Sequence, residues 1–223
     1  MSHSVVLQQK QKCAISIQLL RYCFVCLLVS IGPLALGWTT EFKRPLLWLA
    51  AVLCYRLIEE SGFQADRNKG KRHAEWLFFA LYVGLSGSVV FPAVEFAISS
   101  RPFSLAWTIL GITAVAIGTM FRYLGVKTLG KHFSTHVEVR DDHVLIDSGV
   151  YRYIRHPAYA GVIFFSLGSA LILQSFYSLL FTAFVFWPLI GIRIVIEEQE
   201  LSRELRHYAD YMKRSKRLVP YVF

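Results

Sequence analysis

Residues 149–161 read GVYRYIRHPAYAG and place tyrosines, arginines, a histidine and a proline between two long apolar regions. Pro157 fixes its own φ and pushes His156 toward extended backbone, so we expect a helix to start near Pro157. The first turn of a helix carries N–H groups that lack intrahelical partners and attract a carboxylate or another anionic group. This dense polar cluster therefore predicts a ligand site. The alternative is a belt of interfacial tyrosines with arginines that reach lipid headgroups.

A second group of ionisable residues lies where a later apolar segment ends. Arg193 and Glu197 are four residues apart, so they share one face of a helix and can pair, and Glu198 follows directly. Ionisable side chains at such positions are rare and commonly functional. The group is a candidate for binding a charged ligand, and an ordinary ion pair at the headgroup level is the alternative.

The connection 127–155 contains further residues that could bind a metal or close over a ligand. They are His132, His136, Glu138, Asp141, Asp142 and His143. His132 and His136 have the spacing of two ligands on a helix, but the His-Glu-x-x-His motif is absent. Apolar residues alternate at 137–139 and continue at 143–146, which favours a short hairpin or extended loop. We therefore expect a loop that folds over a ligand, and no metal site.

Membrane helices must position these groups, because 55% of the 223 residues are hydrophobic and only 17% are charged. A helix of roughly 23 residues is about 34 Å long, enough to cross a bilayer core of about 30 Å. Three apolar runs have this length: Ile15–Gly37, Trp76–Ile98 and Ser104–Val126.

Two other apolar segments need a different interpretation. Tyr159–Ile196 is too long for one span and predicts a helical hairpin that turns near Gln174 and Ser175. Pro45–Ile58 is shorter and contains Arg56, so it is either a tilted short span or a re-entrant segment. The expected fold class is an all-α integral membrane protein with about six transmembrane helices, or five if Pro45–Ile58 does not cross.

Basic residues are concentrated in alternate connections. Lysines and arginines gather before the first span, at 67–72, at 127–155 and in the tail at 203–217. The positive-inside rule places these segments, both termini and the candidate site on the cytoplasmic side. The net charge of +9 then reflects topology and attraction to anionic membrane lipid. We expect no nucleic-acid partner, because no aromatic-basic platform or known binding module is present.

The chain divides near residue 126. Residues 1–126 are predicted to form N-terminal transmembrane helices, and residues 127–223 a catalytic region of polar connection, helical hairpin and tail. Apolar side chains recur in the tail at spacings of three to four residues, at Leu201, Leu205, Tyr208 and Met212. This pattern predicts an amphipathic tail helix from about residue 197 to residue 216.

The string 143–161, HVLIDSGVYRYIRHPAYAG, resembles the signature of the isoprenylcysteine carboxyl methyltransferase family. That superfamily also includes phospholipid and small-thiol methyltransferases of membranes. Later features follow in the family's order: Arg193 four residues before Glu197-Glu198, the Tyr208-x-x-Tyr211 pair, and RLVP at 217–220. The resemblance covers about residues 132–223.

This chain departs from the family pattern at two places. Val150 stands where many bacterial relatives have proline, which makes that turn less rigid. LRHY at 205–208 replaces a Phe-Gly or Phe-Pro element, which affects the tail more than the site.

The resemblance implies an integral membrane methyltransferase that uses S-adenosylmethionine and a lipophilic or membrane-associated methyl acceptor. The positions that match the family's cofactor-binding residues are His143, Val144, Leu145, Ile146, Tyr151, His156, Pro157, Ala158, Tyr159 and Glu197. Arg193 matches the arginine placed toward the acceptor, so Arg193 and Glu197 form the implied catalytic pair. A prenylated cysteine carboxylate, a lipid amine and a small thiol all remain open as acceptors.

Methyl transfer from a sulfonium fits this residue set. The reaction is an in-line displacement that mainly requires donor and acceptor to be held about 3 to 3.5 Å apart and aligned. Charge is lost when a cationic donor meets an anionic acceptor, so a dry pocket should favour the transfer. A membrane sterol reductase and a non-enzymatic scaffold are weaker alternatives. The chain is too short for the former, and the retained site residues argue against the latter.

Overall fold

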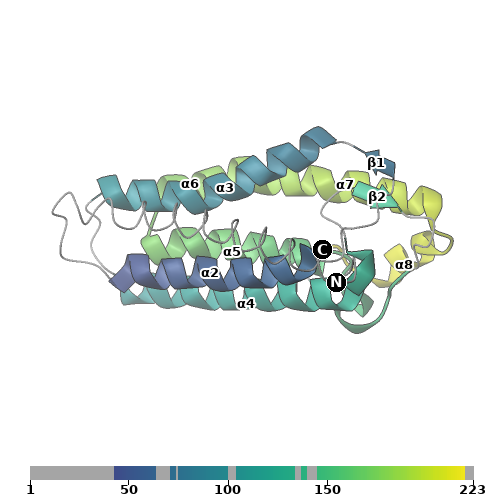
Figure 1. Cartoon of the computed structure of the whole chain (residues 1–223), viewed down its shortest axis with the longest axis horizontal. Coiled ribbons are helices and arrows are strands. Elements are labelled where there is room, and N and C mark those ends of the chain that lie inside the picture. The colour runs from purple at the N-terminus through teal and green to yellow at the C-terminus, as the bar shows by residue number, and fades with distance from the viewer. Residues whose placement is uncertain are drawn as a thin grey trace, which may run out of the picture.

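The computed structural model describes residues 43–63, 71–73, 75–99, 104–133, 137–139 and 145–218. The predicted span Ile15–Gly37 and the predicted site residues His143 and Val144 lie outside these ranges. Among the described residues the chain is almost entirely helical, which agrees with the expected fold class. The helices run side by side along the long axis of the molecule (Figure 1).

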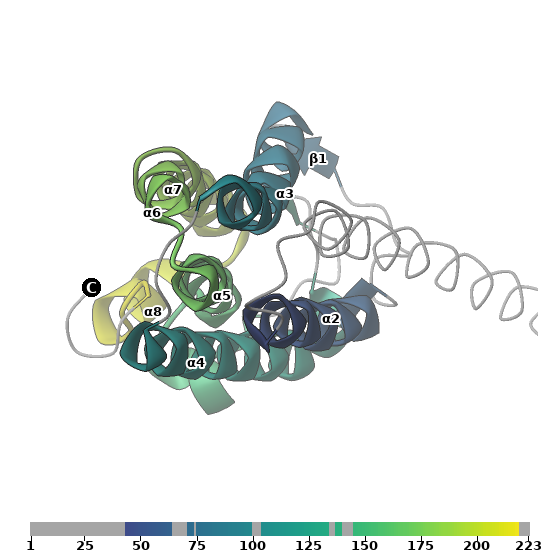
Figure 2. The same ribbon diagram turned by 90° about the vertical axis from the view of Figure 1, so that its left-hand side faces the viewer.

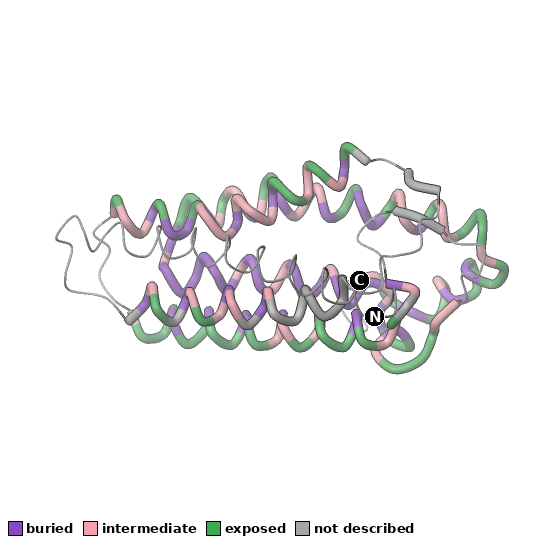
Figure 3. The backbone as a smooth tube through the Cα atoms, viewed as in Figure 1, coloured by how far each residue is buried: buried purple, intermediate pink, exposed green. Residues whose placement is uncertain are grey.

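The helices form two layers when viewed along the bundle (Figure 2). One layer contains α2 and α4, the other contains α3 and the continuous helix made of α6, a π-helical turn and α7, and α5 lies between the two. The bounds are α2 Lys43–Phe63, α3 Glu75–Ile98, α4 Leu105–Leu129, α5 Pro157–Leu173, α6 Phe176–Phe181, the π-turn Thr182–Phe186, α7 Trp187–Glu204 and α8 Tyr208–Arg214. α5 lies against both layers, and most of its residues are buried (Figure 3).

Three helices among the described residues are long and apolar enough to cross a membrane: Trp76–Ile98, Leu105–Leu129 and Phe176–Glu204. The first two agree closely with predicted spans. α5 is shorter at 17 residues, about 26 Å, close to the lower limit for a span. α2 is one continuous helix of 21 residues, so no re-entrant turn interrupts the predicted segment Pro45–Ile58.

The hairpin turn falls where the sequence predicts it. α5 ends at Leu173, and Gln174 adopts left-handed backbone with φ 56°. The N–H groups of Gln174 and Ser175 donate to the Leu171 and Ala170 carbonyls, which satisfies two acceptors that the helix end leaves without partners. The chain then enters α6 at Phe176 and returns along α5.

The α4 and α5 helices make the most extensive contact in the fold, and glycines permit it. A Cβ atom on Gly118 would lie 2.6 Å from the Gly161 carbonyl oxygen and 2.7 Å from the Phe165 nitrogen. A Cβ on Gly168 would lie 2.6 Å from the Gly111 oxygen. The two backbones therefore touch directly, as small residues allow between helices in membranes.

At two places a polar side chain from a neighbouring helix bonds to backbone groups that lack a partner within their own helix. Pro92 lies inside α3 and cannot donate to the Ser88 carbonyl, and the Ser169 hydroxyl of α5 lies 3.4 Å from that oxygen. The buried Glu95 carboxylate accepts from the backbone N–H groups of Tyr177 and Ser178, at 3.2 and 3.0 Å. Glu95 therefore caps the first turn of α6 from α3.

The single tail helix predicted over residues 197–216 is wrong. α7 continues without a break to Glu204, Leu205 is extended, and His207 has left-handed backbone with φ 67° before α8 begins. The break lies within LRHY at 205–208. It turns α8 back toward α5, and Tyr208 and Tyr211 become buried.

A short two-stranded pairing joins distant connections. β1, Lys71–His73, pairs antiparallel with β2, Val137–Val139, and Lys71 lies opposite Val139. The extended conformation expected around residues 137–139 is present. Its partner is the connection between α2 and α3, at the same end of the bundle as α8 (Figure 1).

Candidate active site

The Tyr159 hydroxyl lies between Arg193 and Glu197. It donates a hydrogen bond to Glu197 Oε2 at 2.6 Å and accepts one from Arg193 Nε at 2.9 Å. Arg193 Nε also lies 3.5 Å from Glu197 Oε2, as expected for residues one helical turn apart. The structure thus brings together three of the predicted site residues, one from the first turn of α5 and two from the middle of α7.

The members of this triad, Tyr159, Arg193 and Glu197, differ in how far they are buried. The Arg193 side chain is 1% exposed, whereas 28% of the Glu197 side chain is exposed. Tyr159 packs against the main apolar core, which includes Phe165 and Ile194. A buried guanidinium needs a compensating charge, and Glu197 supplies it. Glu197 is therefore more accessible to a ligand than Arg193 is.

Glu198 lies in a different environment from its neighbour. Its carboxylate accepts from Arg155 Nε at 2.7 Å and from Arg217 Nε at 3.0 Å, and lies 3.2 Å from His156 Nε2. The Glu198 side chain is 6% exposed. This network ties α7 to the residues before α5 and to the end of the described tail.

The tail also pairs with the site through its backbone. Arg155 and His156 donate their N–H groups to the carbonyls of Lys216 and Arg217, at 2.7 and 3.0 Å. Lys216 in turn donates to the Tyr153 carbonyl at 3.0 Å. The tail therefore runs beside residues 153–156 as a short parallel bridge, and this brings Arg217 to Glu198.

The first turn of α5 differs from the open anion site that the sequence suggests. Pro157 occupies the first position, as predicted, whereas His156 is the cap residue with φ −125° and ψ 56° and does not adopt the expected extended backbone. The N–H groups of Tyr159 and Ala160 both donate to the His156 carbonyl. Ala158 packs against Gly125 of α4, where a Cβ would lie 3.0 Å from the Ala158 nitrogen. The fold thus uses this turn for packing, and the side chains carry the site.

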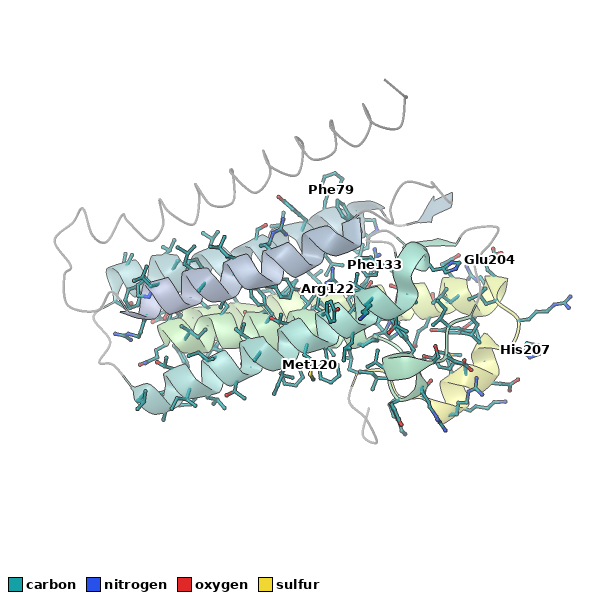
Figure 4. All side chains as sticks on the ribbon, turned by 60° about the horizontal axis from the view of Figure 1, so that its bottom comes forward. Phe79, Met120, Arg122, Phe133, Glu204 and His207 are labelled. Atoms are coloured by element: carbon teal, nitrogen blue, oxygen red, sulfur yellow. The ribbon has the colours of Figure 1, made fainter. Side chains whose placement is uncertain are left out.

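Tyr151 lies in the 3₁₀ turn Gly149–Arg152 and is buried against the end of α4. Its hydroxyl is 3.4 Å from the Gly125 carbonyl, and its own carbonyl accepts from the Tyr211 hydroxyl at 2.6 Å. Burial, reinforced by the negative charge of Glu197, raises the pKa of Tyr151, so its hydroxyl is protonated at neutral pH. Arg122 lies nearby, its guanidinium 5.2 Å from the Phe133 ring centre (Figure 4).

The remaining predicted residues divide into two groups. Leu145 and Ile146 are half-buried and precede the 3₁₀ turn, whereas His143 and Val144 lie outside the described residues. Of the two histidines weighed as metal ligands, His136 is also outside. Within the part of the chain that the structure describes, no three His, Cys, Asp or Glu side chains lie close enough to hold a metal ion.

The role of Glu198 was not predicted from the sequence. The pair of glutamates is visible there, but nothing local distinguishes the residue that faces Tyr159 from the one that faces two arginines and a histidine. The usable signal is the excess of basic residues around it, Arg155 before α5 and Arg217 in the tail, because a buried cation needs a buried carboxylate.

Comparisons with known proteins place this chain among membrane methyltransferases of one family. Residues 109–203 match the model of the isoprenylcysteine carboxyl methyltransferase (ICMT) family. The protein-S-isoprenylcysteine O-methyltransferase of Saccharomyces cerevisiae is 32% identical over 158 residues, which cover 70% of this chain and 66% of that protein. A probable protein-S-isoprenylcysteine O-methyltransferase of Oryza sativa subsp. indica is 30% identical over 158 residues, which cover 68% of this chain and 78% of the relative.

A solved structure described as the eukaryotic intramembrane Ras methyltransferase ICMT shares the fold. The TM-score is 0.57 at 23% identity, with 89% of this chain and 74% of the other covered. The chain covers less than two thirds of several relatives, including 49% of the Dictyostelium discoideum protein-S-isoprenylcysteine O-methyltransferase.

The apolar helices and this shared fold define an all-helical membrane protein. Within that class, the chain belongs to the isoprenylcysteine carboxyl methyltransferase family.

Proposed function

We propose that this chain transfers a methyl group from S-adenosylmethionine to the carboxylate of an isoprenylated cysteine held in the membrane. Relatives at about 30% identity are named for this activity. The observation that carries the proposal is the contact of Tyr159, Arg193 and Glu197 at the end of an apolar bundle. Such a site presents a cation to an anionic acceptor while apolar helices limit water.

The residues present fit S-adenosylmethionine, which carries an ammonium, a carboxylate, ribose hydroxyls and a flat apolar base. Glu197 offers a partly exposed carboxylate, suited to an ammonium or hydroxyl group. Tyr151 and the half-buried Leu145 and Ile146 offer an apolar wall. We assign cofactor binding to these residues, to His143, Val144 and Tyr159, and to the turn His156–Ala158 that positions Tyr159.

Arg193 is suited to orient the acceptor. S-adenosylmethionine supplies an electrophilic methyl group on a sulfonium when it is bound. Arg193 holds a permanent positive charge in a buried setting, and its planar guanidinium matches a carboxylate in two-point geometry. Tyr159 fixes the plane of that guanidinium through Nε. Limited water strengthens the attraction, because charges interact more strongly at a low effective dielectric constant.

The position of the triad suits a substrate that is partly lipid. The continuous helix Phe176–Glu204 has 29 residues, about 43 Å, which is longer than a bilayer core of about 30 Å. Arg193 and Glu197 therefore lie near the edge of the core, where a carboxylate at the headgroup level meets an isoprenyl chain in the hydrocarbon. We further propose six crossings, with both termini and the active site on the cytoplasmic side, and residues 127–223 as the catalytic region.

The proposal is tested by titrating S-adenosylmethionine into the purified chain in detergent, beside Glu197→Ala and Tyr159→Ala. Wild type should bind and both variants should bind at least about tenfold more weakly, since each loses a charge-assisted contact. Tyr177→Phe is the control, because Tyr177 is 68% exposed. A labelled methyl donor with S-farnesylcysteine, a phospholipid amine and a small thiol then identifies the acceptor. Methylation of an amine or thiol instead of the farnesylcysteine carboxylate would contradict the proposed substrate.

A further inference from the structure

We propose that Glu198 is a positioning residue for the methyl-transfer site, which acts by fixing α5 and the tail and touches neither substrate. The inference rests on the proposed function. Two adjacent glutamates then have different roles. Glu197 binds the ligand, whereas Glu198 fixes α5 and the tail in the positions that align Tyr159 with Glu197.

The geometry of a helix explains why the two glutamates differ. Successive side chains are about 100° apart around an α-helix, so adjacent residues face different neighbours. Glu197 meets Tyr159 of α5, and Glu198 meets His156, one turn earlier. The His156 and Tyr159 rings lie 5.7 Å apart. Two consecutive residues of α7 thus contact α5 at two points, which fixes both its rotation and its height against α7.

The charges around Glu198 show that it is an internal partner. Arg155 and Arg217 donate to its two different oxygens, and the carboxylate is almost fully buried. An anion neutralised by two cations has little attraction left for the ammonium or sulfonium of a donor molecule. Removing the carboxylate would leave two arginines facing each other beside His156, so the tail would be repelled from α5.

The tail belongs to the same hydrogen-bonded network as Glu198. Lys216 and Arg217 accept backbone hydrogen bonds from Arg155 and His156, and Arg217 then reaches Glu198 with its side chain. Weakening the Glu198 network therefore releases the segment before α5 and the tail together. The expected consequence is a looser Tyr159–Glu197 contact, and hence a loss of donor affinity even though no donor contact has been removed.

The test uses the full chain in detergent with Glu198→Gln, Arg217→Gln and the double variant. Asp210→Asn is the matched control, since it also changes a carboxylate to an amide but only breaks an exposed pair with Lys213. S-adenosylmethionine affinity is measured by calorimetry and melting temperature by fluorescence. The KM values for the donor and for S-farnesylcysteine are measured separately.

Both single variants should weaken donor binding by about tenfold and raise the donor KM, while the farnesylcysteine KM changes by less than about twofold. The double variant should bind no more weakly than Glu198→Gln, because both changes break one network. If Glu198→Gln does not fold, Arg217→Gln decides, since Arg217 is 38% exposed and is one of three partners.

Unchanged donor affinity in the folded variants, even with a lower melting temperature, would show a purely structural role and overturn the inference. Absence of donor binding by wild type is a distinct result, because it would overturn the proposed function and this inference together. Asp210→Asn should match wild type in every measurement.

Discussion

At the residue scale, the site shows how position on a helix decides the role of a side chain. Glu197 and Glu198 have the same chemistry and adjacent backbone positions, yet one is partly exposed beside a tyrosine and the other is buried among cations. The sequence predicts the pairing of Arg193 with Glu197, because four-residue spacing is a local property. It does not predict the partners of Glu198, because Arg155 and Arg217 reach it only after α5, α7 and the tail have packed.

A second residue-scale feature predicts a response to pH. The buried Tyr211 hydroxyl donates to the Tyr151 carbonyl, and burial raises the pKa of Tyr211 to about 12 from its ordinary value near 10. The fold therefore favours the neutral phenol. This stabilisation is complete below pH 10 and is lost as the pH rises from about 10 through 12.

Tyr211→Phe should accordingly lower stability at neutral pH by about 1 kcal/mol, the net value of one hydrogen bond. The stability of this variant should also fall less steeply as the pH rises above 10, because phenylalanine has no proton to release. Melting temperatures in detergent between pH 8 and pH 11.5 check both effects. An alkaline loss as steep in Tyr211→Phe as in wild type would assign that loss to other groups.

At the element scale, direct contact between two helix backbones sets the position of the site. Gly111, Gly118 and Gly125 recur every seven residues on one face of α4 and meet Gly168, Gly161 and Ala158 of α5. Since Ala158 is in the first turn of α5, this stripe also fixes where Tyr159 lies. The seven-residue spacing is visible in the sequence, but its meaning depends on which helix lies opposite.

Gly118→Ala should destabilise the protein by about 1 to 3 kcal/mol, because the added Cβ would contact backbone atoms that can move only with the whole helix. Gly191→Ala is the matched control. It lies in α7 with nothing within 4 Å of an added Cβ, so replacing a helical glycine there should be neutral or stabilising by up to about 1 kcal/mol. Thermal unfolding in detergent distinguishes the two. Equal stability of Gly118→Ala and wild type would show that α4 and α5 separate without cost.

Predictions of elements from the sequence succeeded where the signal is local and failed where it is tertiary. Trp76–Ile98 and the turn at Gln174 follow from apolar length and polarity alone. The break at 205–207 contains no proline or glycine, and the three-to-four-residue spacing of apolar side chains continues through it. What ends α7 is the burial of Tyr208 and Tyr211 beneath the turn before α5, which depends on distant residues. The pairing of β1 with β2 escapes prediction for the same reason.

At the scale of the whole molecule, the charge distribution and the fold indicate the same orientation. The candidate site, α8 and the β1–β2 pairing all lie at one end of the bundle (Figure 1). Lys127, Arg152, Arg155 and the basic residues of the tail up to Arg217 belong to that end. The opposite end contains Ile98, Ser104 and the turn at Gln174, where basic residues are few. From the positive-inside rule we propose that the site end is cytoplasmic, which would give it access to a water-soluble methyl donor.

Single cysteines in a variant that lacks the four native ones test this orientation. Asp210→Cys lies on α8 at the site end with 67% of the Asp210 side chain exposed, and Ile98→Cys lies at the opposite end, where Ile98 is 73% exposed. In sealed vesicles with the cytoplasmic face outward, a membrane-impermeant maleimide should label Asp210→Cys at once and Ile98→Cys only after detergent is added. Labelling in the reverse order would place the site on the other side of the membrane. Labelling of both before detergent would show that the two ends are not separated by a bilayer, and it would remove the argument for a lipid-borne acceptor.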